Sequence, residues 1–224
     1  MYKFIREDTK EKIYIPFDWC DVTLKKYIGF YDIIKDIEPE NIKDNIFNDL
    51  ELFHKILTYW VGFDATKLMY KDKLDIFSKI VFLFSKVEYT EMTGFSHNNI
   101  IYHLPKNKVD YYGNKMPLAT ATFSEIVECF ELEKAQTFVN SLPFILAILC
   151  KPYGEQYNDQ KVNERATEFE SLSMNYIWSI CFFLISSKNT YKKIIKHYFQ
   201  AQAKRADLIG MDGIMHSLQY QMGT

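Results

Sequence analysis

The chain repeats a pattern of side-chain classes after about one hundred residues. Residues 23–33 align with residues 122–132, and residues 74–84 align with residues 174–184. The two offsets are 99 and 100 residues, an agreement that chance matches between apolar side chains would not require. Because a duplicated unit cannot bury its apolar face alone, the repeat predicts two similar units packed on one another.

We expect a mainly α protein (α+β) in which each copy is a β-hairpin followed by three helices. Apolar residues make up 48% of the chain and charged residues 25%, the balance of a globular protein rather than a disordered one. The predicted domains are a first hairpin-helical repeat at 1–92, a second at 93–188, and a C-terminal basic helix with an interaction arm at 189–224. The repeats would meet through the helices at residues 77–84 and 177–184.

Periodicity and turn residues place the individual elements. In the first copy they predict strands over residues 2–6 and 12–15, and helices over 23–36, 42–61 and 71–85. In the second copy they predict strands over 100–104 and 108–112, a loop over 151–157, and helices over 122–132, 138–150, 158–169 and 174–186. The helix over 174–186 is apolar on nearly every face and therefore belongs at the centre.

Catalytic and cofactor motifs are missing from the sequence, which has no phosphate-binding glycine loop, zinc-protease motif or nucleophile elbow. The five histidines are far apart, and none is followed by a second ligand three or four residues later. The cysteines have no CxxC spacing and are interpreted as reduced, buried side chains. They are Cys20, Cys129, Cys150 and Cys181. We expect a non-enzymatic protein without cofactor or metal, although a Cys–His pair formed by folding stays open for Cys20 and Cys150.

Two polar clusters have both a functional and a structural interpretation. Asp18 and Asp21 flank Trp19 and resemble a sugar-hydrolysing carboxylate pair, but acids ahead of a helix also favour its N-terminal dipole. We interpret Trp19 as a core residue. Arg165 and its neighbouring glutamates, Glu164 and Glu168, are interpreted as a solvated helix face with an internal ion pair.

Basic and apolar side chains are concentrated near the C-terminus. Six bases and no acid lie between Lys188 and Arg205, whereas seven acids lie between Asp32 and Glu51. A head-to-tail contact between copies would pair these stretches. The predicted partner-binding residues are Lys192, Lys193, Lys196, Arg205, Ile214, Met215, Leu218 and Tyr220. Alternatively, the basic stretch binds single-stranded nucleic acid through charge and the rings of Tyr198 and Phe199.

Neither a secretory signal nor a membrane span is expected. Acids occur within the first eight residues, and the longest apolar run, residues 177–185, is shorter than the roughly 20 residues that cross a bilayer. We expect a soluble protein with no membrane partner.

Several short motifs carry a resemblance to a group of phage proteins. They are Phe17-Asp-Trp-x-x-Val-Thr-Leu24, Leu149-x-x-Pro152-x-x-Glu155-x-Tyr157, Glu164-Arg165 followed by Phe169-x-x-Leu172-x-Met174, and Phe182-Phe183-Leu184. Across residues 15–187 the chain resembles small, mostly helical proteins encoded among the structural and tail genes of tailed bacteriophages of Bacteroidota hosts, including the crAss-like phages. The resemblance implies a part made for phage assembly.

That resemblance is compatible with two roles. In the first, which we expect, many copies form a ring in the neck or tail, the head-to-tail connector region of the virion, after assembly in the host cytoplasm. Its partners would be copies of itself and neighbouring neck or tail proteins. A contact with DNA in the conduit, without sequence specificity, stays open. In the second, the protein is a tail assembly chaperone that is not retained in the virion. A nucleic-acid-binding factor is the third alternative.

Overall fold

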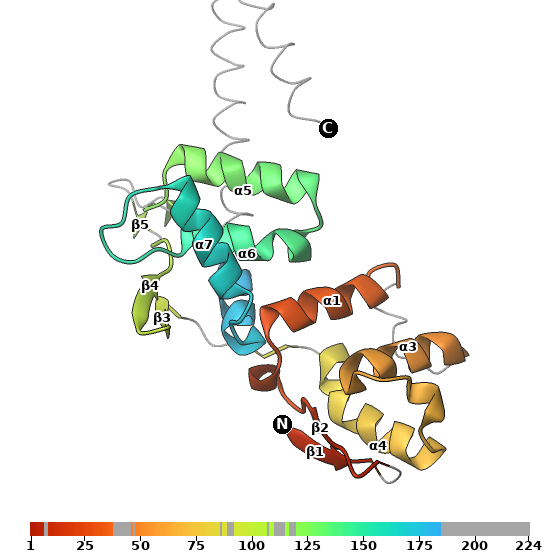
Figure 1. The fold of residues 1–224 in the computed structure, drawn as a ribbon. Coiled ribbons are helices and arrows are strands. Elements are labelled where there is room, and N and C mark those ends of the chain that lie inside the picture. The colour runs from red at the N-terminus through yellow and green to blue at the C-terminus, as the bar shows by residue number, and fades with distance from the viewer. Residues whose placement is uncertain are drawn as a thin grey trace, which may run out of the picture. The chain divides into compact units, whose positions relative to one another are not determined.

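The computed structural model describes residues 1–6, 9–37, 46, 48–85, 87–88, 92–106, 108–109, 115–116 and 120–184 (Figure 1). The protein is mainly helical, with small two-stranded antiparallel sheets, as the sequence predicts. It divides into two compact units, one of residues 1–104 and 121–181 and the other of residues 105–120 and 182–224. The three predicted domains stay a prediction.

The N-terminal hairpin is confirmed. Strand β1 (Tyr2–Ile5) pairs with β2 (Lys12–Ile15), and Phe4 lies opposite Ile13 in the register. Because side chains alternate between the faces of a strand, one face carries the buried residues Phe4, Ile13 and Ile15. This face packs toward the helices that follow, since β2 contacts both α3 and α4.

Local capping explains where the next helices begin and end. Helix α1 (Leu24–Ile34) begins after Thr23, whose hydroxyl accepts a hydrogen bond from the Lys26 amide. Helix α3 (Leu50–Val61) begins after Asp49 and ends at Gly62, which has a φ of 81°. The prediction of one helix from residue 42 to residue 61 is wrong at Asp49, because its extended backbone and capping carboxylate separate α3 from the chain before it.

The third predicted helix is shorter than expected. Helix α4 (Tyr70–Ile80) follows the short 3-10 turn η3 (Ala65–Lys67), and the chain tightens into a second 3-10 turn, η4 (Val81–Phe84). The apolar run therefore continues to Phe84, but the α-helical hydrogen bonding does not.

The second hairpin differs from the prediction. Strand β3 (Gly94–His97) pairs with β4 (Ile100–His103), joined by Asn98 and Asn99, which both have positive φ. Strand β4 corresponds to the predicted strand over residues 100–104, whereas no strand was predicted at β3. In the second unit, β5 (Lys108–Val109) pairs with β6 (Lys115–Met116).

The C-terminal half of the first unit is a group of packed helices. Helix α5 (Phe123–Ala135) and helix α7 (Asp159–Phe169) both contact α6 (Phe138–Leu149). Residues 174–184 form a further helix. Met174, Ile177 and Ile180 are fully buried, which confirms the predicted central position of that helix.

The two halves of the first unit meet through backbone hydrogen bonds and one tryptophan. The amide of Leu24 donates to the Leu172 carbonyl at 2.8 Å, and the amide of Met174 donates to the Val22 carbonyl at 2.7 Å. The ring of Trp19 contacts Phe82 and Trp178 at centroid separations of 5.1 and 5.3 Å. The segments around Phe82 and Trp178 are thus linked through Trp19, which is half-buried and therefore packs at the edge of the core, not inside it as interpreted.

Candidate functional site

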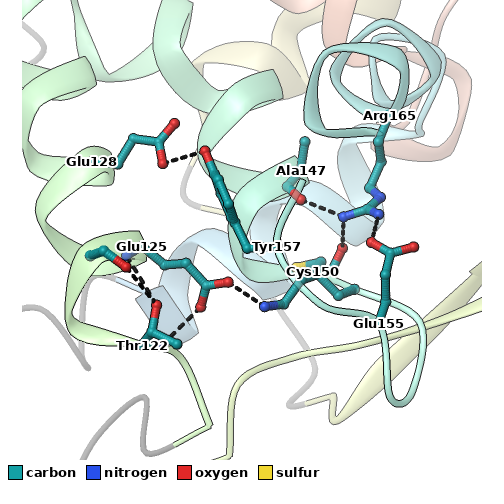
Figure 2. A network of polar contacts seen from close by, with 10 residues as sticks. Thr122, Glu125, Glu128, Ala147, Cys150, Glu155, Tyr157 and Arg165 are labelled. Carbon is teal, nitrogen blue, oxygen red and sulfur yellow. Dashed lines mark hydrogen bonds and ion pairs between the residues drawn. The ribbon is translucent and has the colours of Figure 1, made fainter. Parts of the chain in front are cut away.

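The best-defined polar site of the described residues surrounds the loop between α6 and α7, residues 150–158 (Figure 2). Gly154 has a φ of 79°, a left-handed conformation that a side chain would strain, so glycine suits the turn there. Tyr153 precedes it and is 92% exposed. We call this segment the α6–α7 loop.

One buried arginine holds the inner side of this loop. Arg165 on α7 is 5% exposed and forms an ion pair with Glu155 of the loop. Its guanidinium also donates to the Ala147 carbonyl at 2.6 Å and to the Cys150 carbonyl at 3.5 Å (Figure 2). These carbonyls belong to the C-terminal end of α6, where the helix dipole favours a cation. Arg165 therefore fastens the loop to the helix that precedes it.

The interpretation of Arg165 as part of a solvated helix face is wrong. Residues three or four positions apart on a helix are neighbours, so the sequence analysis paired Arg165 with Glu164 and Glu168. In the structure Glu164 is exposed and accepts a hydrogen bond from Gln160 at 2.9 Å. The partner of Arg165 is instead Glu155, ten residues earlier, because the loop folds back over α7.

A second buried charge holds the start of the loop. Glu125 on α5 is 1% exposed and forms an ion pair with Lys151. Glu125 also completes a capping box, since its carboxylate accepts the Thr122 amide at 2.8 Å while the Thr122 hydroxyl accepts the Glu125 amide at 3.3 Å. The Lys151 carbonyl accepts the His103 amide of β4 at 3.0 Å. Lys151 therefore joins α5, the loop and the second hairpin.

The far end of the loop is held by a tyrosine. The Tyr157 hydroxyl donates to the Glu128 carboxylate on α5 at 2.6 Å (Figure 2). Burial and the hydrogen bonds with Glu128 and Asp159 raise the pKa of Tyr157 above its usual range, so the phenol keeps its proton at neutral pH. Three contacts, at Lys151, Glu155 and Tyr157, thus hold the loop at both ends.

The cysteines near this site are kept in the thiol form. Burial raises the pKa of Cys129, Cys150 and Cys181 to about 12, and a thiol is a much weaker nucleophile than a thiolate. Their predicted burial is confirmed, but that of Cys20 is wrong. Cys20 is exposed in the 3-10 turn η1 (Trp19–Asp21), where the preceding Asp18 carboxylate accepts its amide.

The other candidate residues from the sequence either make local hydrogen bonds or lie outside the described residues. Asp18 caps the 3-10 turn η1, whereas the helix that the dipole interpretation concerned, α1, is capped by Thr23 and has no acid in its first turn. The Asp21 carboxylate accepts the Phe17 amide at 3.3 Å. The eight predicted partner-binding residues all lie outside the described residues. They are Lys192, Lys193, Lys196, Arg205, Ile214, Met215, Leu218 and Tyr220.

The described residues contain neither a metal-binding cluster nor a membrane-spanning helix. No group of three or more His, Cys, Asp or Glu side chains there is arranged to hold a metal ion. Over the same part of the chain, no helix has the length and apolar character needed to cross a membrane.

Comparison with known proteins gives no match to a family model, a curated protein or a solved structure. The charges of the site are neutralised by one another and by backbone carbonyls, an arrangement suited to holding the α6–α7 loop in one conformation.

Proposed function

We propose that the protein is a non-enzymatic structural component of a tailed bacteriophage, forming a multi-copy ring in the neck or tail. The observation that carries the proposal is the use of buried charge. Among the described residues, Glu125 and Arg165 are the charged side chains that lie buried in the interior, and each forms an ion pair with a residue of the α6–α7 loop. A fold that uses its buried charges to hold a surface loop is suited to presenting fixed contact surfaces.

Exposed apolar side chains support the same proposal. Tyr153 at the tip of the fixed loop is 92% exposed, and Ile101 on β4 is 62% exposed. A rigid tyrosine offers a large contact area at a small entropy cost on binding. Further exposed apolar residues lie on the helices, including Leu50 at 66% on α3 and Val127 at 39% on α5. These side chains are available to neighbouring subunits in an assembly.

The sequence after residue 184 supplies the rest of the support. Six bases without an acid are followed by an apolar C-terminal segment, residues 211–224. In a ring, each copy would offer this arm to its neighbour, and a heterologous contact closes when its rotation divides a full turn. The motifs that resemble structural and tail proteins of phages are the support for proposing such a ring in the virion.

Native mass spectrometry of the full chain tests the proposal. We expect a closed multimer at micromolar protein, alone or with the neighbouring neck and tail proteins. A variant that stops after Gly210 should be a folded monomer, with an unchanged far-ultraviolet circular dichroism spectrum. The double substitution Met69→Ser and Tyr70→Ser, which removes exposed apolar side chains outside the arm, is the matched control and should still assemble.

Three outcomes contradict the ring. One is a full chain that stays monomeric with every neighbouring gene product, and a second is unchanged assembly after removal of residues 211–224. The third is a protein that binds tail subunits but is missing from purified virions, which would identify the assembly chaperone instead.

A further inference from the structure

The solvent face of the β1–β2 hairpin carries cations beside an exposed aromatic ring. On this face Lys3 lies directly opposite Tyr14, and Ile5 lies directly opposite Lys12. All four side chains are exposed, with Tyr14 at 57% and Ile5 at 50%. No acid stands at these four positions. We call this set the hairpin face.

The register places Tyr14 next to two lysines. Lys3 faces Tyr14 across the strands, at the roughly 5 Å that separates the Cβ atoms of directly opposite residues. Lys12 is two residues from Tyr14 on the same strand, about 7 Å away along β2. The two lysines therefore start from different sides of Tyr14, and Ile5 lies on the diagonal.

The hairpin face is held in place from behind. Phe4, Ile13 and Ile15 on the opposite face are buried. The Tyr2 hydroxyl donates to the Asp75 carboxylate on α4 at 2.8 Å, and the Lys79 ammonium lies 4.8 Å from the centre of the Tyr2 ring. Since the inner face is held against α4, the strand positions of Lys3, Lys12 and Tyr14 are set before any ligand binds.

We propose that the hairpin face is a contact site for single-stranded nucleic acid, bound without sequence preference. The Tyr14 ring stacks on one base, and the ammonium groups of Lys3 and Lys12 pair with the flanking phosphates. Charge complementarity argues for this occupant, because the four positions of the hairpin face carry two cations and no acid, which attracts a polyanion, and a base offers a π-face to the neighbouring Tyr14 ring. The site goes beyond the proposed ring, since it needs only one copy of the chain.

The test is fluorescence anisotropy of a labelled oligothymidylate with the full chain over a series of salt concentrations. The double substitution Lys3→Gln and Lys12→Gln should weaken binding by about tenfold at low salt and reduce the slope of log affinity against log salt by about 1.4, the value for two phosphate contacts on a single strand. Tyr14→Ala should weaken binding by roughly fivefold or more with little change in slope, and Tyr14→Phe should bind like the native chain because the ring is kept.

The matched control changes the same number of charges elsewhere. Lys55 on α3 and Lys71 on α4 are exposed lysines outside the hairpin face, so Lys55→Gln with Lys71→Gln should leave affinity and slope nearly unchanged. Thermal unfolding of each variant checks that the hairpin remains folded.

Distinct results overturn the site. If the oligonucleotide does not bind, or if substitutions at Lys192, Lys193 and Lys196 alone remove binding, the hairpin face is not the contact. If a polyglutamate peptide competes as well as the oligonucleotide and Tyr14→Ala has no effect, the face binds an acidic protein surface instead. None of these results depends on whether the full chain assembles into a ring.

Discussion

The region up to Phe84 and the region from Gly94 onward are stabilised by different interactions. In the first, aromatic rings form a connected cluster around Phe30, which is fully buried. The rings that contact Phe30 are those of Tyr27, Tyr59, Trp60 and Phe84, at centroid separations of 5.3 to 6.4 Å. Ring contacts of this kind stabilise mainly through buried apolar area, with a smaller geometric preference.

The second region also contains rings but adds buried polar groups. The buried polar or charged side chains of the described residues are Glu125, Ser141, Arg165 and Ser179, and all four lie after Gly94. The two regions share a pattern of apolar positions in the sequence but reach stability by different routes. The pattern of apolar positions specifies which face of a helix is buried, but not whether the space behind it holds a ring or an ion pair.

The largest loss of stability is expected from Phe30→Ala in the aromatic region. Truncating a buried phenylalanine removes apolar area and leaves a cavity, which costs about 4 kcal/mol of unfolding free energy. Chemical denaturation measures the change. Tyr70→Ala is the control, since this ring is 73% exposed and its loss should cost less than about 0.5 kcal/mol. A cost below about 2 kcal/mol for Phe30→Ala would show that the cluster repacks and is not the main support of this region.

Arg165→Met should have the next largest effect, in the charged region. It keeps an apolar stem but leaves Glu155 and the α6 carbonyls without their guanidinium, and breaking one side of a buried pair costs about 3 kcal/mol. The exposed Glu164→Gln on the same helix is the control and should change stability by less than about 0.5 kcal/mol.

A double-mutant cycle sharpens this comparison. Adding Glu155→Gln to Arg165→Met should cost clearly less than the sum of the single changes, because the second substitution removes a carboxylate that has already lost Arg165 and keeps only its 3.6 Å ion pair with the exposed Lys161. Additive costs would mean that Arg165 acts through packing and its carbonyl contacts alone. The two regions would then be more alike than their buried residues indicate.

Local features of the fold could be predicted from the sequence because their causes lie within a few residues. Thr23, Thr122 and Asn158 each stand before an apolar-periodic segment, and each side chain caps the helix that follows. Gly62 ends α3 for an equally local reason, its left-handed backbone. Strand β3 was missed because Gly94-Phe-Ser-His97 contains no β-branched residue, although Asn98 and Asn99 tolerate the positive φ of its turn.

The α6–α7 loop site could not be predicted because its contacts join distant positions. Lys151 and Glu125 are 26 residues apart, and the Arg165 guanidinium reaches carbonyls 15 and 18 residues earlier. Helix periodicity relates only neighbours on one turn, so it assigned Arg165 to the surface. The sequence did contain one signal for a buried Arg165. The arginine lies three positions after Val162 and one before Ala166, which are apolar residues of α7 and are both buried in the structure.

The smallest effects are expected at the two matched helix caps, Thr23 and Thr122. Each hydroxyl accepts one amide at 3.3 Å, so loss of either by substitution with alanine should cost about 1 kcal/mol. Thr122→Ala should cost a few tenths more, because its capping-box partner Glu125 is also the buried partner of Lys151. Thr23→Ser and Thr122→Ser, which keep the hydroxyl, are the controls.

Adding Lys151→Met to each alanine variant should give a coupling energy of about 0.5 kcal/mol with Thr122 and none with Thr23. If Thr122 also shows no coupling energy with Lys151, its cap is independent of the buried ion pair. The two regions would then differ only in their cores.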